Sequence, residues 1–595
     1  MKLKNIFLSA VLVSALCACD DMFKPAIENN HSEEAMLKEP DYAQGLLGYA
    51  YAILPYETKS NWDVATDDAV TNDKSSGYIS MSLGSWSSDN NPMSQWDARK
   101  CAIQYINLFL NVVERVSWST EATKQEMFID KLKGEAYALR ALHYYYLLMA
   151  HGGYGTSGTL LGVPMLMEPE NGASDFNVAR NTFAECVALM LEDLNNAIDL
   201  LPTDYVDLKV GEEGKIPAKY REKGAALGAY NLVFGAKAKN RMSGRIAEAI
   251  KAQVALLAVS PAFADGSGVT SEEAANYAAV VLKRINGVSG MDPEGHKWYI
   301  NTSYLDDLGK GDIAEIVWRG DRTNGKDSWD MGLDQEASNF APTLYGKGRI
   351  NPSQNLVDAF PMENGYPITD ARSGYDPVKP YAGRDPRLGA YVIYDGSTYK
   401  KATITTGSYG STDDAINRID ASTRSGYYLK KLLREDCDPN PSTSLAQYHF
   451  PIRIRYTEIF LAYAEAANQA WGPTGSGSNG FSAYDVIKAI RQRAGVGKTN
   501  GDPYLESVKG NKDQFAELIR NERRLELCFE NKRFWDMRRW KLSLNEAVKG
   551  VDWKTPTTPT YIEVEKRQFS DYQCYGPIPK GEVDKWSNLE QNKGW

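Results

Sequence analysis

The feature that most constrains the fold is a segment near the C-terminus in which the apolar side of a helix becomes ionic. Residues 512–540 show helical spacing, and the face that begins with Phe515 and Leu518 continues through three glutamates at four-residue intervals. Glutamates at this spacing repel each other on an isolated helix. We therefore predict a packed helix with a buried or half-buried ion network, with Arg523, Arg533 and Arg539 as the nearest cationic partners. The signature residues of this segment are Glu522, Arg523, Glu526, Glu530, Arg533, Asp536 and Trp540.

A catalytic carboxylate cluster is the alternative interpretation of the same glutamates. Acid/base sites place their carboxylates in different environments, so that the pKa values separate. Here the glutamates are evenly spaced and interleaved with arginines. We therefore favour the structural interpretation and predict no catalytic residue in this segment.

Composition excludes some classes of partner. The chain has 595 residues and a formal net charge of −10, with no basic stripe, so nucleic acid is a poor partner. It contains 35 Tyr and 13 Trp against 17 Phe, a bias toward rings that stack on flat, polar ligands such as sugars, although core packing accounts for most aromatic residues in any protein. The five histidines show no metal-ligand spacing. We predict neither a metal nor a cofactor.

Residues 1–18 have the features of a lipoprotein signal peptide. A lysine-containing start precedes an apolar run that is too short to span a membrane stably. Small residues then precede Cys19 in a pattern that resembles a lipobox, in which the cysteine after the cleavage point is lipidated. Cys17 is an alternative lipidation site, and an ordinary secretory leader is an alternative to both. Asp20 and Asp21 resemble the signal that exports such lipoproteins to the cell surface.

A tether and three further parts follow the leader. Residues 19–40 are polar and read as a tether, 41–291 as a helical part, 292–450 as a loop-rich variable region and 451–595 as a second helical part. In the first helical part, apolar residues at helical spacing predict helices at 41–54, 96–113, 124–151, 182–200, 219–240, 245–259 and 271–286.

A long loop interrupts the first helical part. Residues 61–95 are rich in Ser, Asn, Asp and Gly and show no sustained period. Loops of this length are often functional. Trp62 and Trp86 lie within it, and Trp329 lies in a polar stretch of the later loop-rich region.

Motifs spread over nearly the whole chain resemble the SusD/RagB family. Glu135-Ala-Tyr-Ala-Leu-Arg140-Ala resembles one family motif, and the segment that contains Glu522 and Trp540 resembles the C-terminal signature. The other matching stretches are Thr66-Asp67-Asp68, Trp96 with Tyr105-Ile106-Asn107, Gly162-Val163-Pro164, Asp385-Pro386-Arg387-Leu388, Arg455-Tyr456, Pro577-Ile578-Pro579 and Asn588 to Gly594.

The resemblance implies a mainly α fold. We expect a tetratricopeptide-like scaffold of helical pairs that carries a large loop-rich irregular region with short strands. Alanines at the helix contact positions agree with close helical pairing. In this family the C-terminal signature is structural, Arg140 is expected to pair with a carboxylate in the core, and Trp96 is assigned to the core.

The resemblance also implies a function. Family members are cell-outer-membrane lipoproteins that serve polysaccharide utilisation and nutrient uptake: they bind a glycan and deliver it to a TonB-dependent (SusC-like) transporter. We therefore expect a lipid-anchored, surface-exposed, non-enzymatic binder of an oligosaccharide or polysaccharide, and no G-x-S-x-G, H-E-x-x-H or P-loop motif is present. Capture of a peptide, as in the RagB branch, is the alternative. A hydrolase and a scaffold without a ligand remain as further readings.

The candidate ligand residues come from the loops. Aromatic rings would stack on sugar faces, and carboxylate or amide groups would bind hydroxyls. Loop packing or contact with a partner is the alternative for each. The candidates are Trp62, Trp86 and Trp329 for stacking and Asp67, Asp68 and Asn72 for polar contacts.

Overall fold

The computed structural model describes residues 37–56, 61–307, 312–321 and 333–595. The predicted signal peptide, most of the tether, Cys19 and Trp329 lie outside the described residues.

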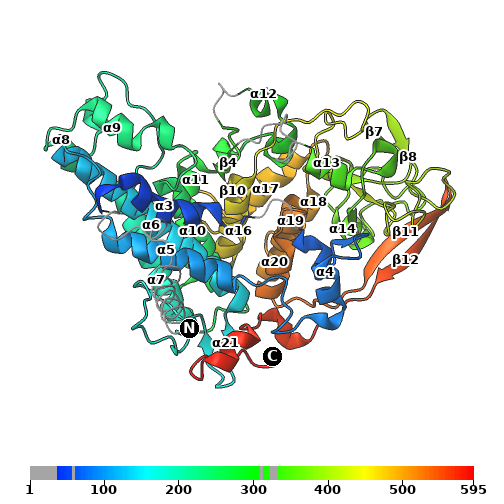
Figure 1. The fold of residues 1–595 in the computed structure, drawn as a ribbon. Helices are drawn as coiled ribbons and strands as arrows, with labels where there is room; N and C mark the ends of the chain where they lie inside the picture. Colours follow the sequence, from blue (N-terminus) through cyan, green and yellow to red (C-terminus); the bar gives the residue numbers. More distant parts are fainter. Residues whose placement is uncertain (1–36, 57–60, 308–311, 322–332) are drawn as a thin grey trace, which may run out of the picture.

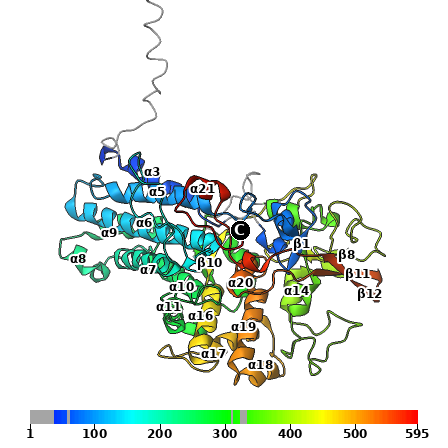
Figure 2. The same ribbon diagram turned by 90° about the horizontal axis from the view of Figure 1, so that it is seen from below.

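The protein is mainly helical, as predicted, and its long helices pack in sequence order (Figures 1 and 2). Each of the first helices contacts the next, and α11 then packs against α16 although the whole loop-rich region separates them in sequence. Helices α16, α17 and α19 thus extend the N-terminal stack. The long helices are α3 (Pro40–Ala52), α5 (Trp96–Val112), α6 (Ala122–His151), α7 (Phe183–Leu200), α10 (Gly244–Ala258), α11 (Ser271–Lys283), α16 (Tyr456–Trp471), α17 (Ala483–Ala494) and α19 (Lys512–Leu527).

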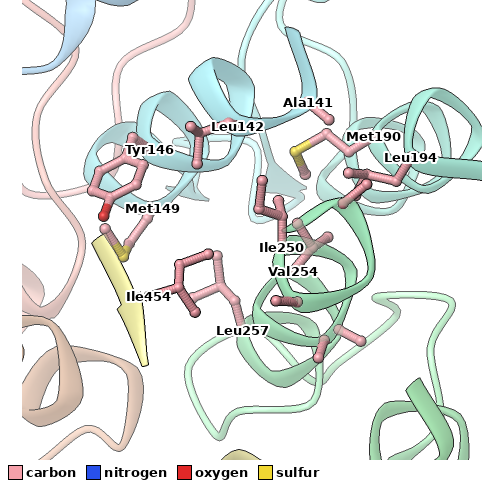
Figure 3. Packing of buried hydrophobic residues seen from close by; sticks show 14 of the residues in the cluster. Ala141, Leu142, Tyr146, Met149, Met190, Leu194, Ile250, Val254, Leu257 and Ile454 are labelled. Carbon is pink, nitrogen blue, oxygen red and sulfur yellow. The ribbon is translucent and has the colours of Figure 1, made fainter. Parts of the chain in front are cut away.

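Local sequence explains where several of these helices begin. Thr182 caps α7 and Thr270 caps α11, each with a glutamate three residues later that returns a hydrogen bond to the cap. Inside the stack, aliphatic side chains of α6, α7 and α10 meet at one core (Figure 3). Ile250 and Val254 of α10 lie between Leu142 of α6 and Leu194 of α7. The amphipathic period of the sequence therefore predicts the buried faces correctly.

One predicted helix is wrong. Residues 219–240 form α8 (Ala218–Arg221), α9 (Leu227–Phe234) and a 3-10 turn at Ala236–Ala238. Gly224 has a φ of +80° between the first two, a left-handed conformation that ends a helix and that glycine adopts without strain.

The loop-rich region consists of short elements, as predicted, and these pack around a second apolar core. Leu525 of α19 and Trp553 of β11 belong to this core, so the region packs on the C-terminal part. We keep the three predicted parts as a proposal for the domain organisation. The short helices of the protein are α4 (Gly77–Ser80), α12 (Thr302–Leu305), α13 (Asp334–Asn339), α14 (Gln354–Ala359), α15 (Arg387–Tyr391), α18 (Pro503–Val508), α20 (Arg533–Arg539) and α21 (Lys580–Lys585).

All strand pairs of the described residues are antiparallel and two-stranded. β1 pairs with β5 and thereby joins the 61–95 segment to the loop-rich region, and β4 pairs with β10 directly before α16. The pairs are β1 (Ala69–Thr71) with β5 (Ile350–Pro352), β2 (Gly153–Tyr154) with β3 (Leu160–Leu161), β4 (Ile316–Arg319) with β10 (Ile452–Arg455), β6 (Val392–Ile393) with β9 (Tyr428–Leu429), β7 (Ser397–Tyr399) with β8 (Ala402–Ile404), and β11 (Val548–Thr555) with β12 (Thr558–Glu565).

The C-terminal signature is not one continuous helix. α19 ends at Leu527, and Phe529 and Asn531 take φ values of 63° and 59° before α20 begins. The chain therefore turns between the two helices, and Glu530 lies in the turn. The prediction of a single helical face through Trp540 is wrong. The two left-handed residues break the helix without changing the spacing of the apolar and charged residues, so the sequence pattern does not reveal the break.

The buried ion network is confirmed. The side chains of Glu522 and Glu526 are fully buried, and Arg387 from the Asp-Pro-Arg-Leu motif donates to both at 2.9 and 3.0 Å. Glu530 accepts from Arg455 at 2.8 Å. Burial alone would raise the Glu526 pKa, but the surrounding arginines outweigh it and hold that pKa well below its ordinary value. The other cations of the network are Arg491, Arg493 and Lys431.

The predicted partners of the glutamates are wrong. Arg523 and Arg539 both donate to Asp536 at 2.8 Å, and Arg533 donates to Asp67 at 2.8 and 2.9 Å. The arginines of the signature point away from its glutamates, and cations from distant segments take their place.

The expected pairing of Arg140 is confirmed. Its guanidinium donates twice to Asp193 of α7 at 2.8 Å and once to Asn107 of α5 at 2.9 Å. Glu135, one turn earlier on α6, is fully buried and accepts from Arg241 and from the hydroxyl of Tyr51. The contacts of Arg140 therefore tie α5, α6 and α7 together.

Candidate functional site

A cavity of about 720 Å³ lies where the helical stack, the C-terminal signature and the loop-rich region meet, and we call it the central cavity. Its helical wall comes from α6, α10 and α16, and α20 with the turn before it closes one side. The loops supply the rest of its lining from the segments 61–78, 298–305, 334–350 and 448–453. The volume falls within the range of small-molecule sites.

Aromatic rings cover much of this wall. Trp62 and Trp535 pack edge to face with ring centroids 5.3 Å apart. The Trp62 indole N–H donates to the hydroxyl of Tyr78 at 2.9 Å, and its backbone N–H donates to Asn531. The remaining aromatic residues of the lining are Tyr56, Tyr145, Tyr146, Trp298, Tyr299, Tyr448, Phe450 and Phe529.

Several polar atoms on the cavity wall have no hydrogen-bond partner among the described residues. They include donors on the indoles of Trp298 and Trp535 and on Arg523 and Asn61, and an acceptor on Gln253. Buried polar groups are nearly always paired, so each of these calls for a partner that the described residues do not supply. A ligand with hydroxyl groups, which both donate and accept, suits this set.

Three cationic side chains of the wall form no ion pair with any of the described residues. No described carboxylate lies within 4.0 Å of the charged groups of Lys347, Arg349 or Arg453, although Arg349 and Lys347 act electrostatically on the Asp73 carboxylate. Arg349 donates to the Asn72 amide oxygen at 3.1 Å, and the Arg453 guanidinium stacks on the Trp318 ring at 4.6 Å. The wall therefore carries positive charge although the whole chain has a net charge of −10.

Asp67 and Asp68 are buried under arginines. Asp67 accepts from Arg533 and forms an ion pair with Arg524, and Asp68 accepts from Arg524 at 2.6 Å. Burial would raise the Asp67 pKa, but Arg524 and Arg533 outweigh it and lower that pKa below its ordinary value. These ion pairs hold the 61–95 segment against the C-terminal signature, and neither aspartate lines the central cavity. Their role in ligand binding stays a prediction that our proposal does not use.

The other predicted site residues fall in two places. Trp62 lines the central cavity, and Asn72 supports its wall by donating to the Lys347 and Ser422 carbonyls at 2.9 and 3.2 Å. Trp86 is only 4% exposed, packs against Phe534 and other C-terminal rings, and does not line the cavity.

The buried carboxyl group of Asp63, next to Trp62 in the chain, should make the free energy of unfolding depend on pH. Burial, together with the Asp68 carboxylate, raises the pKa of Asp63 to about 7. Between about pH 4 and about pH 7 the unfolded chain therefore releases this proton while the folded chain retains it, so the stability contribution of the group falls as pH rises.

Replacing Asp63 with asparagine removes that loss. Relative to the wild type, the variant should gain about 1.4 kcal/mol in free energy of unfolding per pH unit across this window. Urea denaturation of both proteins at about pH 4 measures only the effect of the substitution on packing. Repeating the measurement at increasing pH up to about 7 isolates the contribution of the Asp63 charge. A difference between the two proteins that stays constant with pH would contradict the raised pKa.

Some residues of the central cavity were not among the candidates predicted from the sequence. Tyr78, Trp535, Arg349 and Arg453 line the cavity but come from separate segments without a shared motif. Trp535 lies inside the C-terminal signature, which the sequence analysis treats as structural. Only the positions of the loops relative to the helices bring these side chains together.

No helix among the described residues is long and apolar enough to cross a membrane.

Comparison with protein-family models covers most of the chain. The SusD family model matches residues 314–595. A second model, described as starch-binding associating with outer membrane, matches residues 34–212.

Relatives and solved structures agree with this match. SusD-like protein P38 of Formosa agariphila is 24% identical over 576 residues, which cover 92% of this chain and 93% of that protein. SusD-like protein P2 of the same organism is 28% identical over 221 residues, which are 35% of this chain and 39% of that protein.

A SusD-like protein of Bacteroides fragilis has a TM-score of 0.69 at 22% identity, over 96% of this chain and 100% of that one. A SusD-like carbohydrate binding protein of the same species has a TM-score of 0.66 at 21% identity, over 93% and 99% of the two chains. These structures share the fold described above. Together with the family models and the full-length relative, they show that the chain belongs to the SusD/RagB family.

Proposed function

We propose that the protein captures an oligosaccharide in the central cavity and has no catalytic role. The observation that carries the proposal is the composition of the cavity wall, which combines aromatic rings with unpartnered polar atoms. Rings such as Trp62 offer apolar faces to the C–H side of a sugar, and the unpartnered groups meet its hydroxyls. A solved structure of similar fold, a SusD-like carbohydrate binding protein of Bacteroides fragilis, agrees with this proposal.

The charge of the wall narrows the ligand class. Lys347, Arg349 and Arg453 present cationic groups that form no ion pair within 4.0 Å with a carboxylate of the described residues. A carboxylate or sulfate on the glycan would form charge-assisted hydrogen bonds with them, which are stronger than neutral ones. We therefore propose an anionic oligosaccharide, one that carries uronate or sulfate groups.

The cationic wall can be tested directly. Lys347→Gln and Arg453→Gln should each weaken binding of an acidic oligosaccharide about tenfold, since one charge-assisted hydrogen bond contributes about 1.5–3 kcal/mol. Binding of a neutral oligosaccharide of equal length should change little. Arg418→Gln, a half-exposed arginine away from the cavity, is the control. Isothermal titration at low and high salt measures all three, and equal losses for neutral and acidic ligands would contradict the charge assignment.

We further propose that the protein is a lipoprotein anchored through Cys19 at the cell surface, where it delivers its ligand to a TonB-dependent transporter of the SusC type. The family model's printed association with the outer membrane supports this location. Copurification of a transporter barrel with the tagged protein from its own membranes, lost in a Cys19→Ala variant, would support both parts. Recovery of the wild type from the soluble fraction would contradict the anchor.

A binding panel distinguishes the competing functions. Neutral, uronate-bearing and sulfated polysaccharides are immobilised beside a set of peptides, and soluble oligosaccharides are assayed for new reducing ends. We expect binding to a glycan class without release of reducing ends. Binding to peptides alone would favour RagB-like capture, and release of reducing ends would show a hydrolase.

A further inference from the structure

Three side chains of metal-ligating type meet beside the central cavity. Glu336 lies in α13, and Cys437 and His449 lie in the segment that leads to β10. One ligand atom of each lies within 4.8 Å of the other two. Within the described part of the chain, this is the one group of three or more such residues close enough to share a metal ion.

The contacts of His449 place two acceptors opposite each other. Its Nδ1 lies 3.0 Å from the Gln447 carbonyl oxygen, which can only accept, so Nδ1 carries the proton. In the neutral ring Nε2 then presents a lone pair, and it lies 3.1 Å from the Glu336 carboxylate. A cation bound by both groups removes this conflict. A second proton on the ring is the alternative.

Glu336 is buried with one oxygen unsatisfied. Its side chain is fully buried, and Oε1 accepts from the Arg434 backbone N–H at 2.7 Å. Oε2 has no hydrogen-bond partner within the part of the chain that the structure describes. An unpaired buried acceptor costs about 1–3 kcal/mol, more when charged, and a metal ion would supply the missing partner.

Cys437 completes the group with a soft ligand. The residue is fully buried. Burial raises the pKa of its thiol well above the ordinary value and the Glu336 and Asp436 carboxylates add to this, while a hydrogen bond with the Gln447 backbone acts in the opposite direction. In the metal-free protein the sulfur therefore keeps its proton.

We propose that Glu336, Cys437 and His449 bind one Zn²⁺ ion, with water as the fourth ligand. Thiolate, imidazole and carboxylate form a zinc-type donor set. The hydrogen bond from His449 Nδ1 to a backbone carbonyl is the usual support of a metal-bound imidazole. On binding, the S–H bond of Cys437 breaks, a Zn–S bond forms and the proton passes to solvent. The thiolate and the carboxylate then balance the two charges of the ion.

The site would stabilise one side of the central cavity. Cys437 and His449 bracket a loop that is closed by a β-bridge between Asp438 and Leu445. His449 itself lines the cavity, and so do residues of α13 on both sides of Glu336. One ion would therefore link the 437–449 loop to α13. This site is independent of the proposed glycan function.

Metal titration tests the site. The protein from residue 20 onward is stripped with a chelator and titrated with Zn²⁺ against a chromophoric competitor, and with Co²⁺ for its thiolate charge-transfer absorption. We expect one tight equivalent of Zn²⁺ and the cobalt–thiolate band. Cys437→Ala and His449→Gln should each weaken Zn²⁺ binding at least tenfold, whereas Cys101→Ala, which removes a thiol elsewhere, should leave it unchanged.

Folding is checked for each metal-free variant by its circular dichroism. His449 is partly exposed, so His449→Gln retains the test if Cys437→Ala fails to fold. Absence of tight Zn²⁺ binding by the wild type would overturn the proposal. Binding retained in His449→Gln, or no thiolate band with Co²⁺, would overturn it as well.

Discussion

Replacing Arg387 with alanine should lower the free energy of unfolding by about 3–5 kcal/mol. The Arg387 side chain is fully buried and donates to Asp385, Glu522 and Glu526 at 2.6 to 3.0 Å. Its removal leaves carboxylates in the core without their shared cation, and an uncompensated buried charge is strongly destabilising. Urea denaturation near neutral pH measures the loss.

Arg372 provides a matched control. It pairs with Asp370 two residues earlier, just as Arg387 pairs with Asp385, and the N–O distances of 2.7 and 2.9 Å are similar. The Arg372 side chain is 60% exposed, however, so water solvates the remaining charge after substitution. Arg372→Ala should therefore change the free energy of unfolding far less than Arg387→Ala does. Equal losses in the two variants would show that burial of the network does not govern its contribution.

Trp62→Ala should weaken glycan binding at least about tenfold, which corresponds to about 1.4 kcal/mol. The substitution removes a ring from the cavity wall and leaves the Tyr78 hydroxyl without its indole donor. Calorimetric titration with the tightest ligand of the panel measures the change. Trp62→Phe, which keeps an aromatic face, should lose less.

Trp86→Ala is the control for Trp62. Both tryptophans come from the same segment and are nearly equally buried, at 4% and 5% exposure. Trp86 packs against Phe569 and Trp595 and does not line the cavity. Its replacement should destabilise the protein by about 3–5 kcal/mol but leave the affinity of the folded fraction unchanged. Weaker binding in Trp86→Ala than in Trp62→Ala would contradict the position of the site.

The sequence predicts local features well because their causes are local. The period of apolar residues alone predicts α5, α6, α7, α10 and α11 nearly to their ends. The helix predicted at 219–240 fails where Gly224 takes a left-handed φ. The pattern of apolar residues alone does not reveal that break.

The sequence does not predict which residues far apart in the chain form contacts with each other. The glutamates of the signature plainly require cations, but Arg387 and Arg455 reach Glu526 from other parts of the chain. Trp86 lies in a segment that the sequence predicts to be a loop. The aromatic rings that cover it come from the C-terminal end of the chain, so the local sequence does not indicate that it is buried. Trp62 was predicted to contact ligand and does line the cavity, yet Tyr78 and Arg453 join it only through the tertiary fold.

A crystal structure of the protein with the tightest oligosaccharide of the panel tests the central claim most directly. We predict the glycan in the central cavity, with a sugar face against the aromatic wall at Trp62 and an anionic group near Lys347 or Arg453. The unpartnered indole N–H of Trp535 should then lie within hydrogen-bond distance of a ligand oxygen. A glycan bound on another surface, with the central cavity holding only water, would contradict the proposal.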